Sequence, residues 1–127
     1  MNIEKVIFSF FIVLALTLNF GFFMGDISNP EHHSVYELFA AIVVSLIATV
    51  LKFGERTQIG AVLLATSLVA DLQLIAAAIV WGMAMQVSAA GLTPSTMAVI
   101  VSLAGGALAA NVISVVLLIV DIAALRR

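Results

Sequence analysis

The stretch TQIGAVLLATSLVADLQLIAAAIVWGMAMQ, from Thr57 to Gln86, decides the fold of this chain. It is apolar almost throughout, and it is longer than the roughly 20 residues that a helix needs to cross the hydrocarbon core of a bilayer. One carboxylate, Asp71, lies near its middle. A charged side chain at the centre of a bilayer costs about 2.5–3.5 kcal/mol on insertion scales, so Asp71 is predicted to face protein or trapped water and not lipid.

Composition extends this conclusion to the whole chain. The 127 residues are 64% hydrophobic and 9% charged, whereas a soluble domain is typically about 45–50% apolar and about 25% charged. Four apolar segments reach or approach the length of a membrane span. The sequence therefore predicts a single all-α domain over residues 1–127, a polytopic transmembrane four-helix bundle in contact with the lipid bilayer. The helices are expected at about 6–24, 30–53, 57–86 and 94–124.

The charged residues and the missing residue types narrow the function classes and predict the orientation. A net charge of -2 argues against nucleic acid as a partner. The chain has no cysteine and no phosphate-binding glycine motif, so neither an enzyme nor a cofactor is expected. All five basic residues fall on the side that the two termini share with the link between the second and third helices: Lys5, Lys52, Arg56, Arg126 and Arg127. The positive-inside rule then places both termini in the cytoplasm.

Asp71 belongs to a stripe of small and polar residues along one face of the third helix. Helical spacing brings together Gly60, Ser67, Asp71, Ala78 and Gly82, and Gln73 adds a polar group on an adjacent face. One interpretation is an ion or proton site, because a carboxyl inside the membrane can exchange a proton or a cation. The other is a structural acid that is hydrogen-bonded to Ser, Thr or Asn of a neighbouring helix.

The fourth helix carries a ridge of small residues at intervals of four, which is typical of close helix packing within or between subunits. Its members are Ala98, Ser102, Gly106, Ala110 and Ser114. Asn111 lies beside the ridge at nearly the depth of Asp71, and we expect these two side chains to form a polar contact at the midplane. Asn19, in the outer half of the first helix, is predicted to join the same network.

Two further features lie at the outer end. Gly21 and Gly25 form a GxxxG pair, which either allows two helix backbones to approach closely or leaves Gly25 as the end of the first helix. Polar residues follow in the outer loop, and His33 and Glu37 are spaced one helical turn apart. This pair is a weak candidate for a metal site, and a solvated loop is the favoured interpretation.

Two stretches, LTLNFGFFMGD (residues 16–26) and LKFGERTQIGAVLLATSLVADLQLIAAAIVW (residues 51–81), resemble a family of small bacterial inner-membrane proteins without a known activity. The resemblance covers most of the chain. It implies a bacterial source and a multi-pass protein of the inner, or cytoplasmic, membrane, and it implies nothing about mechanism.

Two hypotheses for function follow. The first is a small channel or transporter, oligomeric because 127 residues leave little interior for a pathway, with Asp71 as the ion-interacting acid. The second is a non-transporting accessory or assembly subunit of a larger membrane complex, in which Asp71 and Asn111 hold helices together. A hydrated environment around Asp71 would favour the first, and dry packing the second.

Overall fold

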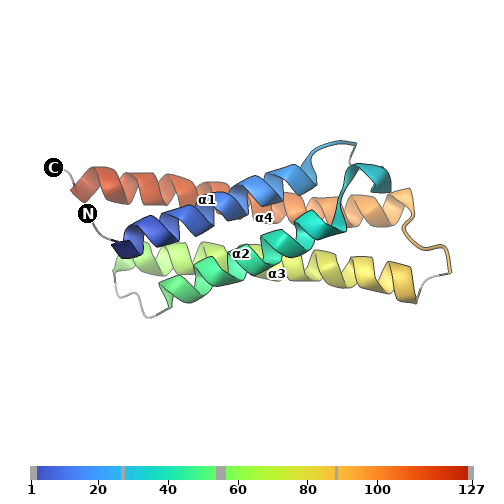
Figure 1. Cartoon of the computed structure of the whole chain (residues 1–127), viewed down its shortest axis with the longest axis horizontal. Coiled ribbons are helices and arrows are strands. Elements are labelled where there is room, and N and C mark those ends of the chain that lie inside the picture. Colours follow the sequence, from blue (N-terminus) through green and yellow to red (C-terminus); the bar gives the residue numbers. More distant parts are fainter. Residues whose placement is uncertain (1–2, 27, 54–56, 88, 126–127) are drawn as a thin grey trace.

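The chain folds into four long antiparallel helices, as the sequence predicts (Figure 1). A computed structural model describes all residues except 1–2, 27, 54–56, 88 and 126–127. The α-helices are α1 (Ile3–Phe23), α2 (Val35–Lys52), α3 (Gln58–Gln86) and α4 (Pro94–Leu125), and a short 3-10 helix, η1 (Pro30–His32), precedes α2. All four α-helices are long and apolar enough to cross a membrane.

Local signals in the sequence explain where the third and fourth helices begin. The Thr57 hydroxyl accepts a hydrogen bond from the backbone N–H of Gly60 at 2.9 Å, and the Thr93 hydroxyl accepts one from Thr96 at 3.1 Å. Each bond satisfies a donor that would otherwise lack an intrahelical partner. Pro94 then fits the first position of α4, where no N–H is needed. The helix continues without a break through Gly105 and Gly106.

The second helix differs from its predicted range, 30–53. Asn29 and Pro30 do start a helical turn, because the Asn29 side chain accepts from the backbone N–H of Glu31 at 3.0 Å. That turn ends after His32, since His33 and Ser34 are extended, and α2 starts at Val35. The reason is tertiary: the His33 ring turns inward to bond backbone carbonyls near the end of α1. The link predicted at 54–56 and the basic residues Arg126 and Arg127 lie outside the described residues.

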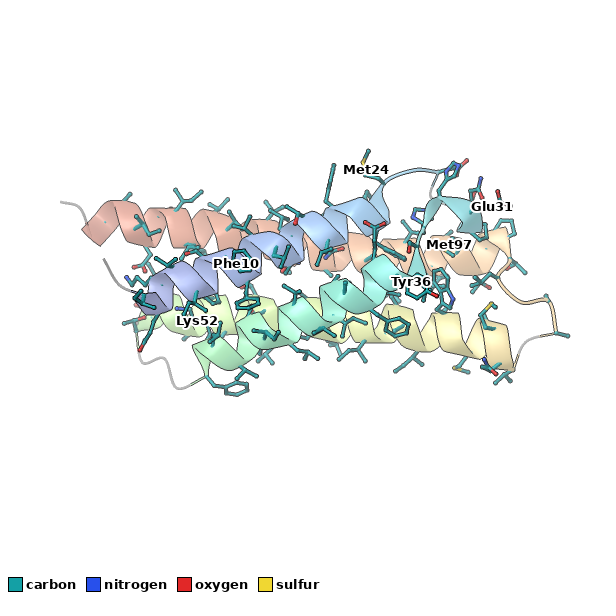
Figure 2. All side chains as sticks on the ribbon, in the orientation of Figure 1. Phe10, Met24, Glu31, Tyr36, Lys52 and Met97 are labelled. Atoms are coloured by element: carbon teal, nitrogen blue, oxygen red, sulfur yellow. The ribbon has the colours of Figure 1, made fainter. Side chains whose placement is uncertain are left out.

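Helices that are consecutive in the chain pack against each other, and α4 also packs against α1. The start of α1 and the ends of α2 and α4 therefore lie at one end of the bundle (Figure 1). Lys52 lies at this end, whereas Met24 and Glu31 lie at the other (Figure 2). A salt bridge of 3.5 Å between Lys5 and Asp121 joins α1 to α4 at the first end.

The buried residues recur mostly at steps of three and four. On α1 they are Phe8, Ile12, Ala15, Asn19 and Phe22, and on α3 they are Gly60, Leu63, Ser67, Ala70, Asp71, Leu74, Ala77 and Ala84. This spacing, 3.5 residues on average, is that of left-handed bundles. The opposite faces carry exposed large hydrophobic residues such as Phe10, which is 60% exposed, as expected for helices surrounded by lipid (Figure 2).

Candidate functional site

The buried polar residues of the bundle form one layer between two apolar clusters. The cluster at the end of the bundle near Lys52 contains Phe8, Ile12, Ala48, Leu63 and Leu118. The larger cluster contains, among others, Phe22, Leu38, Ala41, Ala70, Leu74, Met97 and Ala104. Polar side chains fill the positions between these two clusters on all four helices: Asn19, Ser45, Thr49, Thr66, Ser67, Asp71, Asn111 and Ser114. We refer to these eight residues as the polar layer.

Asp71 is the only carboxylic acid of the polar layer. It lies near the middle of α3 and is 5% exposed. Its Oδ1 accepts a hydrogen bond from the Ser45 hydroxyl at 2.6 Å, and its Oδ2 lies 2.5 Å from the Thr49 hydroxyl oxygen. Both partners come from α2 and are themselves buried. Among the described residues no cationic side chain contacts this carboxyl, so hydroxyl groups alone compensate its burial.

Ser45 and Thr49 are the residues that sequence reasoning missed. They are one helical turn apart, and this spacing places both hydroxyls on one face of α2. Two hydroxyls one turn apart in an apolar span are a usable signal, because a span has few other groups that can bond an intramembrane acid. Asp71 and Asn111, which were predicted to form a polar contact, bond other partners in the described part of the chain.

Asn111 instead belongs to a second polar contact, between α1 and α4. The Asn19 amide is oriented so that both its nitrogen and its oxygen are hydrogen-bonded. The Asn19 side-chain nitrogen donates to the backbone carbonyl of Ala104 at 3.0 Å. Its oxygen accepts from the backbone N–H of Leu108 at 3.0 Å and from the side chain of Asn111 at 3.2 Å. Asn19 is fully buried. The predicted participation of Asn19 in a buried polar network is therefore observed, with Asn111 as its side-chain partner.

Two buried polar atoms of the layer, the Ser67 hydroxyl oxygen and the Asn111 Oδ1, have no hydrogen-bond partner among the described residues. The hydrogen bond of 2.5 Å between Thr66 and Ser114 fixes the register of α3 against α4. At about 1.5 Å per residue, this register places Asn111 between Ser67 and Asp71 along the bundle axis, about 3 Å from each level. The layer thus retains unused hydrogen-bonding capacity close to the level of Asp71.

The two central glycines of α4 allow close packing on either side of the helix. A Cβ atom on Gly105 would lie 2.9 Å from the Phe23 ring, and a Cβ atom on Gly106 would lie 2.7 Å from Cδ of Gln73. Gln73 therefore packs against the backbone of α4, half-buried at the edge of the polar layer and outside its network. Gly106 acts as the packing residue that the sequence predicts.

Only some of the other residues of the predicted small-residue ridge are buried in the bundle. Ala110 and Ser114 are buried, whereas Ser102 is exposed and Ala98 is only half-buried. On α3, Gly60 is buried but Gly82 is exposed with nothing near its Cβ position, so the prediction that Gly82 packs is wrong within this chain. Residues spaced four apart are rotated by about 400° around the helix axis, which is about 40° more than a full turn. A ridge with this spacing therefore leaves the buried face after a few steps.

At the end of the bundle that contains Met24 and Glu31, the paired glycines have different roles. Gly21 lies within α1 and packs against the Glu37 carboxyl group. Gly25 lies beyond the end of α1 and has a φ of 101°, a backbone conformation that glycine adopts without steric cost. The GxxxG packing prediction is therefore wrong for Gly25, and the alternative, a residue that ends the helix, is confirmed.

His33 is a structural residue of the same end of the bundle and is 4% exposed. Its Nδ1 lies 2.5 Å from the carbonyl oxygen of Phe22 and its Nε2 lies 2.8 Å from that of Asp26. These contacts tie the start of the α2 region to the C-terminal end of α1 and to the loop that follows it. Both ring nitrogens thus lie against backbone carbonyl oxygens, and the Glu37 carboxyl group packs against Gly21.

Asp26 is exposed in the loop between α1 and η1. Its carboxylate accepts hydrogen bonds of 3.1 Å from the backbone N–H and from the hydroxyl of Ser28. These bonds hold the pKa of Asp26 below its ordinary value, because they favour the charged form, and the imidazoles of His32 and His33 act in the same direction. Asp26 is therefore a loop-ordering carboxylate.

Comparison with known proteins agrees with the resemblance drawn from the sequence. No curated protein and no solved structure matches the chain. One family does match, over residues 32–122. This range includes α2, α3, most of α4 and all polar-layer residues except Asn19. The chain belongs to this family, DUF6394, a family of unknown function.

Proposed function

We propose that the protein is a small channel or transporter of the bacterial inner membrane, and that Asp71 is the acid with which it exchanges a proton or a cation. The observation that carries the proposal is the setting of Asp71: a titratable group near the middle of a candidate span, inside a polar layer to which all four helices contribute. Buried ionisable groups within membrane spans are costly, and they commonly mark ion pathways and proton relays.

The orientation and the location belong to the same proposal. Lys5 and Lys52 lie at one end of the bundle, and the described residues at the other end include Asp26 and Glu31. The positive-inside rule assigns the first end to the cytoplasm. The protein thus has both termini inside, and we assign it a non-enzymatic role without a cofactor.

A second candidate function, a non-transporting accessory or assembly subunit, is supported by a different observation. Asp71 is 5% exposed, and each of its two oxygens has a hydroxyl partner on α2. This is the arrangement that an acid serving only to join two helices would adopt. Both candidates therefore use the same residues, and they differ in whether the charge of Asp71 is needed.

We further propose that the protein self-associates through the outward part of the small-residue ridge. Ser102 is exposed, and a shallow groove of about 500 Å³ follows it along α4, lined by Ser95, Ala98, Val99, Ser102 and Leu103. Small residues let a second helix approach closely. Light scattering in detergent should show an oligomer that Ser102→Phe dissociates, and a monomeric wild type would remove this part of the proposal.

The test of function is a flux assay on the purified protein in liposomes that contain a pH-sensitive dye, with an imposed proton or cation gradient. Asp71→Asn keeps the side-chain volume and the ability to hydrogen-bond but removes the titratable group, so flux should be lost while thermal stability is retained. Asp121→Asn is the matched control, because it makes the same chemical change at a carboxylate paired with Lys5. Flux that Asp71→Asn leaves unchanged would remove Asp71 as the ion-exchanging group. A wild type without any flux would favour the accessory subunit.

A further inference from the structure

We infer that ions reach Asp71 from the end of the bundle that contains Lys52, and that the side chain of Phe8 closes this route. The inference deepens the proposed function, and it rests on that function for the ion that travels along the route. The direction of access follows from three features: the position of Asp71 beside α2, the packing around Phe8 and the contacts of Phe22.

Asp71 lies close to one end of α2 and far from the other. Its partner Thr49 is three residues before Lys52, the last residue of α2, which corresponds to about 4.5 Å along the helix axis. Its other partner, Ser45, is ten residues after Val35, the first residue of α2, or about 15 Å along the axis. The path beside α2 from Asp71 to the end with Lys52 is therefore the shorter one.

Phe8 lies on this shorter path. It is the largest side chain of the smaller apolar cluster, which separates the polar layer from the end with Lys52, and it is 1% exposed. The α2 residue of this cluster is Ala48, one helical turn before Lys52. Because the side chain of Ala48 is small, the Phe8 ring fills the space beside the last turn of α2. Movement of this ring would open the polar layer toward that end.

The Phe8 ring is covered by a flexible side chain. Lys52 Nζ lies 4.3 Å from the centroid of the ring, in the position of a cation–π contact. The lysine ammonium is carried by a flexible stem of four carbons. This contact can hold the ring over the polar layer, and it can be released by rotation of side chains while the helix backbones keep their positions.

Phe22, the buried phenylalanine toward the other end of α1, is held more firmly. Its ring centroid lies 5.5 Å from that of His33 and 6.2 Å from that of Trp81. The two ring nitrogens of His33 lie 2.5 and 2.8 Å from backbone carbonyl oxygens, so the ring that packs on Phe22 is itself fixed to the backbone. Opening at Phe22 would break these contacts together, whereas opening at Phe8 moves side chains only.

Silver ions can test the direction of access, because the chain has no cysteine and an introduced thiol is then the softest ligand that Ag⁺ meets. Ser45→Cys places a thiol of similar size beside Asp71. Ag⁺ is added to one face of membrane vesicles, and the remaining free thiol is measured by maleimide labelling of the unfolded chain. Glu4→Cys and Glu31→Cys, each in a separate chain, replace exposed residues at the two ends and identify the two faces of the vesicle.

The thiol of Ser45→Cys should react several-fold faster with Ag⁺ added on the side of Glu4 than on the side of Glu31. Adding Phe8→Ala should raise the rate from the Glu4 side several-fold further, because the ring no longer closes the path. Phe22→Ala is the matched control, since it truncates another buried phenylalanine of α1, and it should leave this rate unchanged. Phe8→Leu keeps more of the buried apolar surface and should give a smaller rise than Phe8→Ala.

Equal rates from the two sides, or a faster rate from the Glu31 side, would overturn the inference, as would Phe22→Ala raising the rate as much as Phe8→Ala. The comparison of the two sides needs no substitution of Phe8, so it decides the direction of access even if Phe8→Ala fails to fold. The outcome is independent of the flux assay. Faster reaction from the Glu4 side without any flux keeps the route and removes transport. Flux together with faster reaction from the Glu31 side keeps transport and removes the role of Phe8.

Discussion

Replacing Asn19 by alanine should destabilise the bundle several times more than the same change at Asn111. Asn19 makes three hydrogen bonds to α4, with Ala104, Leu108 and Asn111. Interhelical hydrogen bonds in membranes average about 0.6 kcal/mol, so these three contribute about 2 kcal/mol together. Asn19→Ala also leaves the whole Asn111 amide without a partner, because its Oδ1 already has none. An orphaned buried polar group costs about 1–3 kcal/mol, so a total loss of about 3–5 kcal/mol is expected.

Asn111→Ala removes only the 3.2 Å bond to Asn19, and it also removes the unpartnered Oδ1. Its expected cost from hydrogen bonding is therefore about 0.6 kcal/mol or less. Both substitutions delete the same atoms from fully buried positions, so the contributions from the resulting cavities are similar and cancel in the comparison. The double variant should be more stable than Asn19→Ala alone, because the orphaned amide is gone.

The assay is reversible unfolding in mixed micelles of detergent and dodecyl sulfate, followed by circular dichroism. It gives the free energy of unfolding of the wild type, both single variants and the double variant. The reasoning is refuted if Asn111→Ala costs as much as Asn19→Ala, or if the double variant is less stable than Asn19→Ala. Either result would mean that the Asn19 amide does not join α1 to the backbone of α4.

Three other expectations can be checked independently. Gly106→Ala should lower the melting temperature in detergent because its Cβ collides with Gln73, and Gln73→Ala in the same chain should restore it. Reporter fusions at the C-terminus and in the link between α2 and α3 should read cytoplasmic, and a fusion near Gly91 should read periplasmic; a periplasmic C-terminus would end the model with both termini inside. The lowered pKa of Asp26 means that its contribution to stability is present above the unfolded pKa of about 3.9 and is lost as the pH falls through the folded value. The drop in melting temperature below about pH 4 should therefore be smaller in Asp26→Asn than in the wild type, and an equal drop would place the acid sensitivity elsewhere.

The sequence predicts the helices well where local chemistry sets their boundaries. Thr57 and Thr93 each cap a helix start, and the long apolar runs between these points leave no alternative to a span. The prediction fails at the start of the second helix because the decisive interaction is not local. His33 leaves the helical path to bond the carbonyls of Phe22 and Asp26, which precede it by 11 and 7 residues.

The candidate site, like the helices, can be predicted only where the signal is local in the sequence. Asp71 can be found from the sequence because a carboxyl in an apolar span is conspicuous. Its partners cannot be derived, since they depend on which faces of α2 and α3 meet. In a membrane protein the lipid-facing and buried faces are both apolar, so hydrophobicity does not separate them. The spacing of residues along a helix is a better guide to which face is buried. The buried positions mostly follow steps of three and four, whereas the ridge with a spacing of four has an exposed member at Ser102.

The composition of the polar layer bears on which function is correct. If the layer served only to join helices, its polar atoms would be expected to bond one another, because an unpartnered polar atom in the membrane interior weakens the bundle that it should strengthen. Asn19 and Asp71 meet this expectation, whereas the Ser67 hydroxyl and the Asn111 Oδ1 do not. These unpartnered atoms lie on α3 and α4, about 6 Å (Ser67) and about 3 Å (Asn111) from the level of Asp71 along the axis. Unpartnered polar atoms close to an intramembrane acid are more consistent with the proposed channel or transporter than with a layer that only joins helices.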